Sequence, residues 1–356
     1  MKIITIIGAR PQFIKSSILS KTIGKYSEIN EVIIHSGQHF DSNMSEVFFE
    51  EMGIKKPKYN LKINSSQKGT TMIGRMIEKC EAILKIEKPD LVLVYGDTNT
   101  TLAGALSANN LNIPIAHVEA GLRSFNHFMP EEINRIITDK ISTYLFCPTQ
   151  KAVENLMKEG LSENQKIFKC GDVMQDAAFY YAEKSAIKSN VISKINLSKF
   201  ILCTLHRAEN TDNEIKLRSI VNSLNEIHKT TPIVLPLHPR TKLKIQELGL
   251  NLNVNIIDPV GYFDMMELLK KCALVLTDSG GLQKEAYFFK KNCVTMRDET
   301  EWVELIEKKV NIIVGSEKDK IVNGVNLMLN QKSDFTSDLY GNGNACHIIV
   351  KEISNK

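Results

Sequence analysis

The order of apolar segments constrains the fold of this chain more than any other feature of its sequence. Short runs rich in Val, Ile and Leu, each ended by turn residues, alternate with longer segments of helical period. This alternation is typical of βαβ units, in which parallel strands form a sheet whose faces are covered by helices. The runs read KIITIIG, EVIIHSG, DLVLVYGD, IPIAHVEA and TYLFCPT, and then FILCTLHR, PIVLPLHP, VNIIDPV, ALVLTDSG and CVTMRD.

The two series of strands predict two domains. The alternation pauses near KCGDVMQD and resumes near Phe200, after a segment rich in Ser, Asn and Lys. A chain of 356 residues is also long enough for two hydrophobic cores. We therefore predict an α/β protein of two Rossmann-like domains, residues 1–170 and 171–342, with a cleft between them. The amphipathic segment 343–356 is expected to pack back on the first domain as a helix.

Composition argues against several classes of partner. The net charge is only +4, and no Lys/Arg block is interleaved with aromatic residues, as a nucleic-acid surface would require. No segment approaches the roughly 20 apolar residues of a membrane span. The seven cysteines are scattered and form no Cys-x-x-Cys pair, as expected for reduced thiols. We therefore expect a cytoplasmic protein that binds neither nucleic acid nor membrane.

Cofactor motifs are also missing from the sequence. The first turn, GARPQF, has only one of the three glycines of a dinucleotide-binding fingerprint, which argues against NAD. No HExxH motif is present either, so we expect no metal site. The chemistry is therefore expected to rest on side chains alone, without a cofactor.

The segment TDSGGLQKEA predicts a nucleotide site in the second domain. Ser279, Gly280 and Gly281 lie between an apolar strand and a helix, where their N–H groups can bind a phosphate or diphosphate. Glu285, six residues after Ser279, could accept two hydroxyls of a ribose. The alternative is that Ser279 only caps its own helix.

Carboxylates gather near strand ends in the first domain. Asp97 and Glu119 each follow an apolar strand, where a carboxylate is costly to bury and usually faces a ligand or a cation. Glu131 and Arg135 lie four residues apart on one predicted helix, so a surface salt bridge is the alternative to a catalytic role. Carboxylates that share a site raise one another's pKa, which suits general acid–base catalysis.

Positively charged or ionisable groups follow strands in both domains. Arg10 and Lys15 flank the neutral Gln12 in the first turn, which lacks the further glycines of a phosphate-binding loop. His206 follows an apolar strand of the second domain, where an imidazolium could neutralise a leaving phosphate or protonate it. A histidine hydrogen-bonded into a turn is the alternative.

Nine ordered motifs give the chain a family resemblance that covers residues 3 to about 315. They are GARPQFIK, SGQH, GDTNTT, HVEAGLRS, PEEINR, LHRAEN, LHPRT, TDSGGLQKEA and RDETEW. In order and approximate spacing they resemble the non-hydrolysing UDP-N-acetylglucosamine 2-epimerases. The resemblance implies an isomerase of the glycosyltransferase-B architecture, a UDP-sugar substrate and a homodimer.

The resemblance also implies a mechanism. UDP is eliminated anti across C1 and C2 to give a 2-acetamidoglucal, and its re-addition after protonation of the other face inverts C2. By resemblance, Asp97, Glu119 and Glu131 transfer the C2 proton, and Arg135 orients them. The residues expected around the UDP-sugar are Arg10, Gln12, Lys15, the catalytic His206 at the diphosphate, the seat of Ser279, Gly280 and Gly281, and Glu285 at the ribose.

Departures from the commonest motifs indicate a particular substrate. Many family members read GTRPExIK and TERPE, whereas this chain has Ala9 and Gln12 in the first motif and Trp302 and Val303 in the second. These residues resemble the branch acting on UDP-2,3-diacetamido-2,3-dideoxyglucuronate, used for bacterial surface polysaccharide such as lipopolysaccharide O-antigen. A neutral Gln12 would not repel the C6 carboxylate of that sugar.

Three other functions remain open at this point. One is epimerisation of UDP-N-acetylglucosamine itself to the manno form. Another is a glycosyltransferase of the same architecture, which needs the phosphate seat and the ribose carboxylate but not three carboxylates near C2. The last is a non-catalytic UDP-sugar sensor, in which three carboxylates near C2 would have no function.

Overall fold

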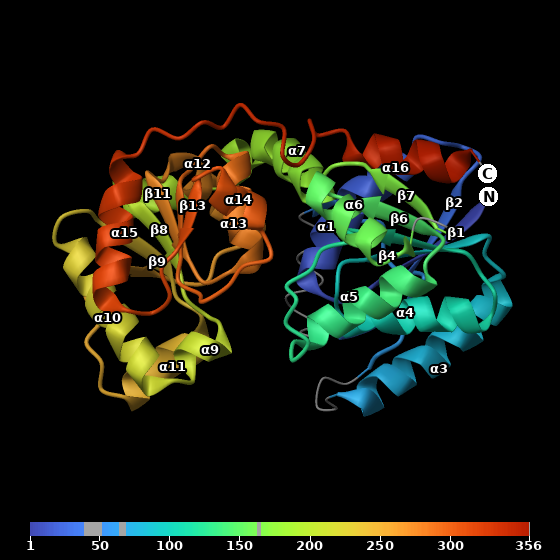
Figure 1. The fold of residues 1–356 in the computed structure, drawn as a ribbon, viewed down its shortest axis with the longest axis horizontal. Helices are drawn as coiled ribbons and strands as arrows, with labels where there is room; N and C mark the ends of the chain where they lie inside the picture. Colours follow the sequence, from blue (N-terminus) through green and yellow to red (C-terminus); the bar gives the residue numbers. More distant parts are fainter. Residues whose placement is uncertain (39–51, 64–68, 162–164, 356) are drawn as a thin grey trace. The chain divides into compact units, whose positions relative to one another are not determined.

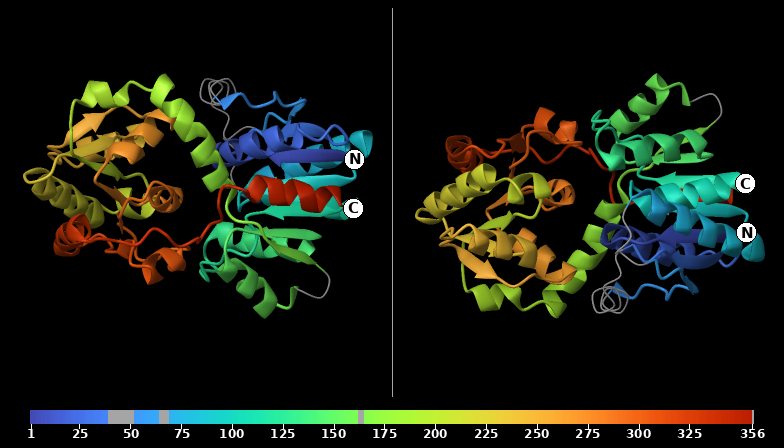
Figure 2. Two further views of the ribbon diagram at one scale, coloured as in Figure 1. Left: turned by 90° about the horizontal axis from the view of Figure 1, so that it is seen from above. Right: turned by 90° about the horizontal axis from the view of Figure 1, so that it is seen from below.

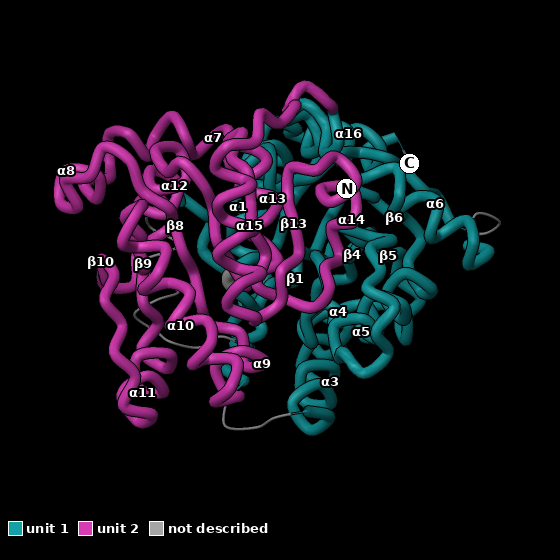
Figure 3. Tube along the Cα trace, turned by 60° about the vertical axis from the view of Figure 1, so that its left-hand side comes forward, with its two compact units in different colours: residues 1–177, 338–356 teal, residues 178–337 magenta. Residues whose placement is uncertain are grey.

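The chain folds into two compact units. The computed structural model describes residues 1–38, 52–63, 69–161 and 165–355. Unit 1 comprises Met1–Ala177 and Asp338–Lys356, and unit 2 comprises Ala178–Ser337 (Figure 3). Each unit is built on one parallel sheet with helices on its faces, which confirms the predicted α/β fold class (Figure 1). None of the described helices has the length and apolar character needed to cross a membrane.

The sheet of unit 1 has, among the described residues, seven strands in the order β3-β2-β1-β4-β5-β6-β7. The strands are β1 (Lys2–Ile7), β2 (Asn30–His35), β3 (Tyr59–Asn60), β4 (Leu91–Tyr95), β5 (Ile115–Val118), β6 (Tyr144–Cys147) and β7 (Lys166–Lys169). The helices of this part of the chain are α1 (Arg10–Ile23), α3 (Thr70–Glu87), α4 (Asn99–Asn110), α5 (Pro130–Ile141), α6 (Gln150–Lys158), the first turns of α7 (Val173–Lys188), and α16 (Ala345–Ser354).

Two groups of helices cover the sheet of unit 1. Helices α3, α4 and α5 pack side by side below the sheet in the view of Figure 1. Helix α16, from the end of the chain, lies on the opposite face beside α1 (Figures 1 and 2). The central strands are therefore buried on both faces, which explains why β1 and β4 read as continuous apolar runs.

The sheet of unit 2 has, within the described residues, six strands in the order β10-β9-β8-β11-β12-β13. The strands are β8 (Ile201–Thr204), β9 (Ile233–Pro236), β10 (Asn255–Ile257), β11 (Leu274–Thr277), β12 (Cys293–Thr295) and β13 (Asn311–Ile313). The helices are the rest of α7, α8 (Val191–Ile195), α9 (Ala208–Thr211), α10 (Glu214–His228), α11 (Pro239–Glu247), α12 (Tyr262–Lys271), α13 (Gly280–Phe288), α14 (Val303–Glu307) and α15 (Lys318–Asn330).

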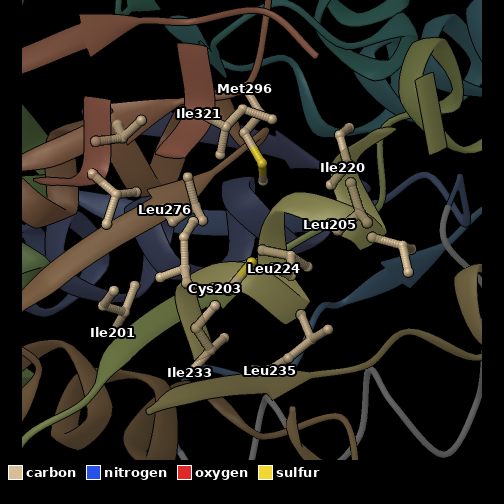
Figure 4. Packing of buried hydrophobic residues seen from close by; sticks show 14 of the residues in the cluster. Ile201, Cys203, Leu205, Ile220, Leu224, Ile233, Leu235, Leu276, Met296 and Ile321 are labelled. Atoms are coloured by element: carbon tan, nitrogen blue, oxygen red, sulfur yellow. The ribbon is translucent and has the colours of Figure 1, made fainter. Parts of the chain in front are cut away.

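Alternate side chains of the unit 2 strands enter two separate hydrophobic clusters. Ile201 and Cys203 of β8 join the cluster that contains α10 and α15 residues, which Figure 4 shows from close by. Leu202, between them, joins the cluster with residues of α12 and α13. Leu276 and Val275 of β11 divide in the same way. Because successive strand residues point to opposite faces, and both faces are covered, β8 and β11 carry apolar residues at three successive positions.

Strand order brings particular loops together. In unit 1, β1 pairs with β4 and β4 pairs with β5, all parallel. In unit 2, β8 pairs with β11 in parallel. Since parallel strands end at the same edge of a sheet, the loops after β1, β4 and β5 are neighbours, and so are the loops after β8 and β11. These loops carry most of the site residues predicted from the sequence.

Candidate active site

The loop after β1 is held by the buried side chain of Gln12. Its Oε1 accepts hydrogen bonds from the two backbone N–H groups that follow β1, at 2.8 and 3.0 Å. Its Nε2 donates to the last carbonyl oxygen of β4, at 2.9 Å, and to two threonine hydroxyls, each at 3.0 Å. The partners are Gly8, Ala9, Tyr95, Thr98 and Thr101. Gln12 therefore links the first loop to the loop that carries Asp97.

This position of Gln12 differs from the one predicted from the sequence. The prediction has Gln12 facing the substrate, whereas its side chain is 1% exposed and its amide is occupied by protein groups. The same loop is tightly packed at Gly8, where a Cβ atom would lie 1.9 Å from the hydroxyl oxygen of Ser36. Arg10 begins α1, and its side chain lies outside the described residues.

Two ion pairs occupy the carboxyl edge of the unit 1 sheet. The Lys15 ammonium, on α1, pairs with the Glu119 carboxylate after β5. The Arg135 guanidinium, on α5, pairs with the Asp97 carboxylate after β4. Gly96 lies beside the first pair, because a Cβ atom there would be 3.2 Å from Glu119 Oε2 and 3.5 Å from Lys15 Nζ. The structure thus brings four of the predicted site residues to one edge of one sheet.

The two neighbouring glutamates at the start of α5 have different environments. Glu131, the predicted catalytic residue, has an exposed side chain. Glu132 is fully buried, and its carboxylate accepts hydrogen bonds from the backbone N–H groups of Ser124 and Phe125. Glu132 also lies 3.2 Å from Arg135, which it orients together with Asp97. Nothing in PEEINR distinguishes the two glutamates, so the sequence does not predict a role for Glu132.

In unit 2, Asp278 organises the loop after β8. Its fully buried carboxylate accepts hydrogen bonds from the backbone N–H groups of His206 and Arg207, at 2.9 to 3.2 Å. Its Oδ1 also lies 3.3 Å from His206 Nδ1, while about half of the His206 side chain is exposed. Asp278 is not among the site residues predicted from the sequence. Its position at the end of a buried strand was the available signal.

Two further ionisable groups of unit 2, His238 and Arg240, interact electrostatically with the region of His206. The pKa of His238 is lowered by burial and by the positive charges of His206 and Arg240. Arg207 follows His206 directly, and its guanidinium lies 3.5 Å from the position of a Cβ atom built on Gly280. Arg240 is paired with Asp212 and Asp278 lies beside His206, so these groups do not form a uniformly positive surface.

The N-terminus of α13 is shaped by its two glycines. Ser279 is the N-cap residue, but its side chain makes no capping hydrogen bond, so the alternative of a simple helix cap is wrong. A Cβ atom at Gly280 would lie 2.4 Å from Glu301 Oε1, whereas Gly281 is exposed. Glu285 lies in the second turn and is half-buried.

Trp302 braces the same helix end. Its indole Nε1 donates a hydrogen bond to the Gly280 carbonyl oxygen at 3.0 Å, and the Lys284 ammonium lies 4.0 Å from its ring centroid. Arg297 pairs with Glu301 at 3.0 Å. The TEWVE segment, noted for its departure from the family motif, therefore supports the predicted phosphate seat. Across the part of the chain that the structure describes, no group of three or more His, Cys, Asp or Glu side chains is arranged to hold a metal ion.

Comparison with known proteins gives the same family as the motifs. A family profile described as UDP-N-acetylglucosamine 2-epimerase matches residues 21–354. A UDP-2,3-diacetamido-2,3-dideoxy-D-glucuronate 2-epimerase of Pseudomonas aeruginosa is 54% identical over 99% of this chain and 99% of its own length. A UDP-N-acetylglucosamine 2-epimerase of Methanocaldococcus jannaschii is 45% identical over 99% of this chain and 98% of its own length.

Solved structures agree with the sequence relatives. The fold resembles the crystal structure of M. jannaschii UDP-GlcNAc 2-epimerase in complex with UDP-GlcNAc and UDP, with a TM-score of 0.91 and 44% identity over the whole of both chains. The Neisseria meningitidis UDP-GlcNAc 2-epimerase bound to UDP-GlcNAc gives a TM-score of 0.91 at 32% identity, again over both whole chains. The chain therefore belongs to the UDP-N-acetylglucosamine 2-epimerase family, as its motifs predict, and is an isomerase of UDP-sugars.

Proposed function

We propose that the protein inverts C2 of UDP-2,3-diacetamido-2,3-dideoxyglucuronate by anti elimination and re-addition of UDP. The observation that carries the proposal is the pair of carboxylate–cation contacts at one sheet edge, Glu119 with Lys15 and Asp97 with Arg135. General acid–base chemistry at a carbon needs carboxylates held at fixed positions, and these cations hold them.

The elimination breaks two bonds, C2–H and C1–O. A carboxylate removes the proton from C2, the C–H electron pair forms the C1–C2 double bond, and the C1–O bond breaks as UDP leaves with its electrons. No carbonyl acidifies C2, so proton removal depends on stabilising the charge that develops on the diphosphate. Re-addition of UDP follows protonation of C2 from the other face. Asp97, Glu119 and Glu131 supply the proton-transfer groups.

Unit 2 supplies the groups for the UDP moiety. The Ser279–Gly281 seat and His206 bind the diphosphate, and Glu285 accepts the ribose hydroxyls. The uncapped N-terminus of α13 and the Arg207 guanidinium near Gly280 support this assignment. His206, oriented by Asp278, neutralises the charge that builds up as the C1–O bond breaks.

The choice of the acidic sugar rests on the 54% identical P. aeruginosa enzyme. The second candidate is UDP-N-acetylglucosamine, the substrate named for relatives at 45% identity. Because Gln12 is buried, it does not contact the sugar directly. Its neutrality matters only because a glutamate at the same position would add a negative charge that repels an acidic sugar. Two unit charges about 10 Å apart interact by about 1–2 kcal/mol at an effective dielectric constant near 20.

The setting of the reaction belongs to the same proposal. The product serves the synthesis of bacterial surface polysaccharide, such as lipopolysaccharide O-antigen, and the enzyme works as a cytoplasmic homodimer. All seven cysteines are free and buried, which suits a reducing compartment. The dimer rests on the family resemblance, and light scattering of the purified protein tests it.

A panel of UDP-sugars in deuterium oxide tests the function. We expect inversion at C2 with deuterium incorporated there, and a higher kcat/KM for the diacetamido uronate than for UDP-N-acetylglucosamine, both followed by NMR. A higher kcat/KM for UDP-N-acetylglucosamine overturns the choice of substrate. Absence of deuterium at C2, with sugar transfer to an added acceptor, supports the glycosyltransferase instead.

Carboxylate variants test which residues transfer the C2 proton. Glu119→Gln and Asp97→Asn are expected to lower the rate of C2 exchange by at least about 100-fold, since general acid–base groups contribute roughly 10²- to 10⁴-fold. Glu78, an exposed residue of α3, gives the matched control Glu78→Gln, which should leave the rate unchanged. Equal rates in the Glu119 and control variants would exclude Glu119 as a proton-transfer group.

A further inference from the structure

His117 is a fully buried histidine next to the catalytic edge of unit 1. It lies on β5, two residues before Glu119. Its Nδ1 is 2.7 Å from Asp139 Oδ1, and its Nε2 is 2.7 Å from the carbonyl oxygen of Gly96. Asp139 belongs to α5, and Gly96 begins the turn after β4. One imidazole ring therefore joins three elements that meet at the site.

The partners of the ring determine its protons. A carbonyl oxygen can only accept a hydrogen bond, so Nε2 must carry a hydrogen to bond Gly96. Asp139 also faces the ring with an acceptor, because its other carboxylate oxygen accepts hydrogen bonds from Arg123 Nη1 and the Gly121 backbone N–H, which favour the ionised carboxylate. Both ring nitrogens are therefore donors, which only the imidazolium form provides.

The surrounding charges balance an imidazolium. Asp139 Oδ2 accepts from Arg123 Nη1 at 2.8 Å and from the Gly121 backbone N–H at 3.1 Å. Arg123 in turn donates to both carboxylate oxygens of Glu159, at the end of α6, at 2.7 and 2.8 Å. Two cations and two carboxylates then sum to zero. The nearby thiol of Cys147, on β6, stays neutral because burial raises its pKa.

With a neutral His117, the network, in which only Glu159 is exposed, would keep one uncompensated negative charge, and one ring nitrogen would face an acceptor at 2.7 Å with no hydrogen between them. Both changes are costly in the protein interior. Outside the network, Lys15 pairs with Glu119, and Arg135 lies against both Asp97 and the buried Glu132, so these charges sum to minus one. They give no reason for His117 to lose its proton.

The hydrogen bond from His117 to Gly96 fixes the backbone next to the Asp97 carboxylate. Gly96 has φ +64 and donates its N–H to the Val118 carbonyl oxygen at 2.9 Å, while its carbonyl is held by His117. Asp97 is the next residue. A turn held at both its N–H and its C=O presents Asp97 to Arg135 in one orientation.

We propose that His117 is a protonated positioning residue, whose imidazolium holds the Gly96 carbonyl and thereby places Asp97 for proton transfer at C2. The placement of Asp97 as the group that acts at C2 rests on the proposed function. The protonation state of His117 does not, because it follows from the hydrogen bonds alone.

NMR of the full chain labelled with ¹⁵N-histidine tests the protonation state. We expect both ring nitrogens of His117 to carry a directly bonded hydrogen at neutral pH, with the signal assigned by its loss in a His117 variant. His347, which is exposed on α16, provides the matched reference for a solvated imidazole, and its variant His347→Gln should leave the His117 signals in place. A His117 ring with one nitrogen lacking hydrogen overturns the proposal.

Two amide variants separate the two hydrogen bonds. In His117→Gln the amide nitrogen reaches the position of Nε2 and can still donate to Gly96, whereas in His117→Asn it replaces Nδ1 and can donate only to Asp139. We expect His117→Asn to lower kcat by about 10- to 100-fold with KM within about threefold, because misplacing a catalytic group by about 1 Å costs that much. His117→Gln should retain clearly more of kcat.

If His117 had only a structural role, the two variants would have equal kcat, because both remove the buried cation and lower the melting temperature. Equal kcat in the two variants, per folded molecule, therefore overturns the positioning role. If the unmodified protein shows no C2 exchange with any UDP-sugar, the proposed function fails, while the NMR result still decides the protonation of His117.

Discussion

At the scale of single residues, Gln12 shows how a site side chain can act without reaching the substrate. Its amide makes five hydrogen bonds, which tie the loop after β1 to the end of β4 and the first turn of α4. Two of these bonds satisfy backbone N–H groups that the loop leaves unpaired. The loop that carries Arg10 is thus held against the loop that carries Asp97.

Removing this amide should loosen both loops. We expect Gln12→Ala to lower the free energy of unfolding of unit 1 by about 2–4 kcal/mol, since each buried N–H without a partner costs roughly 1–3 kcal/mol. Native-state hydrogen exchange of β1 and β4 amides measures it. Gln12→Glu keeps the two acceptor bonds and should lose less. Gln150→Ala, at an exposed position of α6, is the control and should stay within about 0.5 kcal/mol. Unchanged exchange in Gln12→Ala would refute this role.

At the scale of elements, Glu87 anchors the end of α3. A carboxylate at a helix C-terminus opposes the helix dipole. Here it pairs with Lys2 of β1 and accepts from Lys58 Nζ at 2.6 Å and from the hydroxyl of Tyr59 on β3. These groups outweigh the dipole, and their hydrogen bonds lower the pKa of Glu87 from 4.5 to about 2. One residue therefore connects a helix to two strands.

The lowered pKa of Glu87 predicts a pH-dependent contribution to stability. A carboxyl group whose pKa is lower in the folded than in the unfolded state stabilises the folded state fully at pH values above its unfolded-state pKa. The contribution of Glu87 should therefore be present above pH 4.5 and fade as the pH falls toward about 2. Glu87→Gln should remove it. The Lys58 side chain is 58% exposed and therefore screened, so we expect a loss of about 1 kcal/mol at pH 7.

Urea unfolding of the native and Glu87→Gln proteins between pH 3 and 7 measures the effect. The two stability curves should converge as the pH falls. The control is Glu78→Gln, on the same helix but exposed. A constant difference between the curves at every pH would show that the charge of Glu87 is not responsible.

At the scale of the whole molecule, the chain leaves unit 1 within α7 and completes it with α16. Cys346, Ile349 and Ile353 of α16 are at most 2% exposed, and the Asp176 carboxylate accepts from the backbone N–H groups of Ala345 and Cys346. Figure 2 shows α16 beside α1. Unit 1 thus depends on residues that are synthesised after the whole of unit 2.

A cavity in α16 should therefore weaken one unit only. We expect Ile349→Ala to lower the free energy of unfolding of unit 1 by about 2–5 kcal/mol, as for other buried large-to-small changes. Hydrogen exchange should show the loss in β1 and α1 but not in β8 or β11. Lys351→Ala, at an exposed position of the same helix, is the control. Equal losses in both units would mean that they unfold as one cooperative body.

The sequence predictions were accurate where a feature depends on a short stretch of the chain, and they missed features that depend on packing between distant segments. Continuous apolar runs identified the parallel strands, because strands buried on both faces have no polar side. The same runs placed Asp97, Glu119 and His206 at strand ends. PEEINR could not tell Glu131 from Glu132, since burial of one and exposure of the other depend on how α5 packs against the loop at Ser124 and Phe125. GARPQFIK likewise did not reveal that Gln12 points inward.

The sequence by itself determined the family, the α/β class of both units and the strand-end positions of most site residues, because periodicity and ordered motifs are local properties of the chain. Only the tertiary structure decided which side chains pair: Lys15 with Glu119, Arg135 with Asp97, and His117 with both Asp139 and Gly96. Those contacts join residues far apart along the chain. Strand order and helix packing bring them together, and no short motif encodes either.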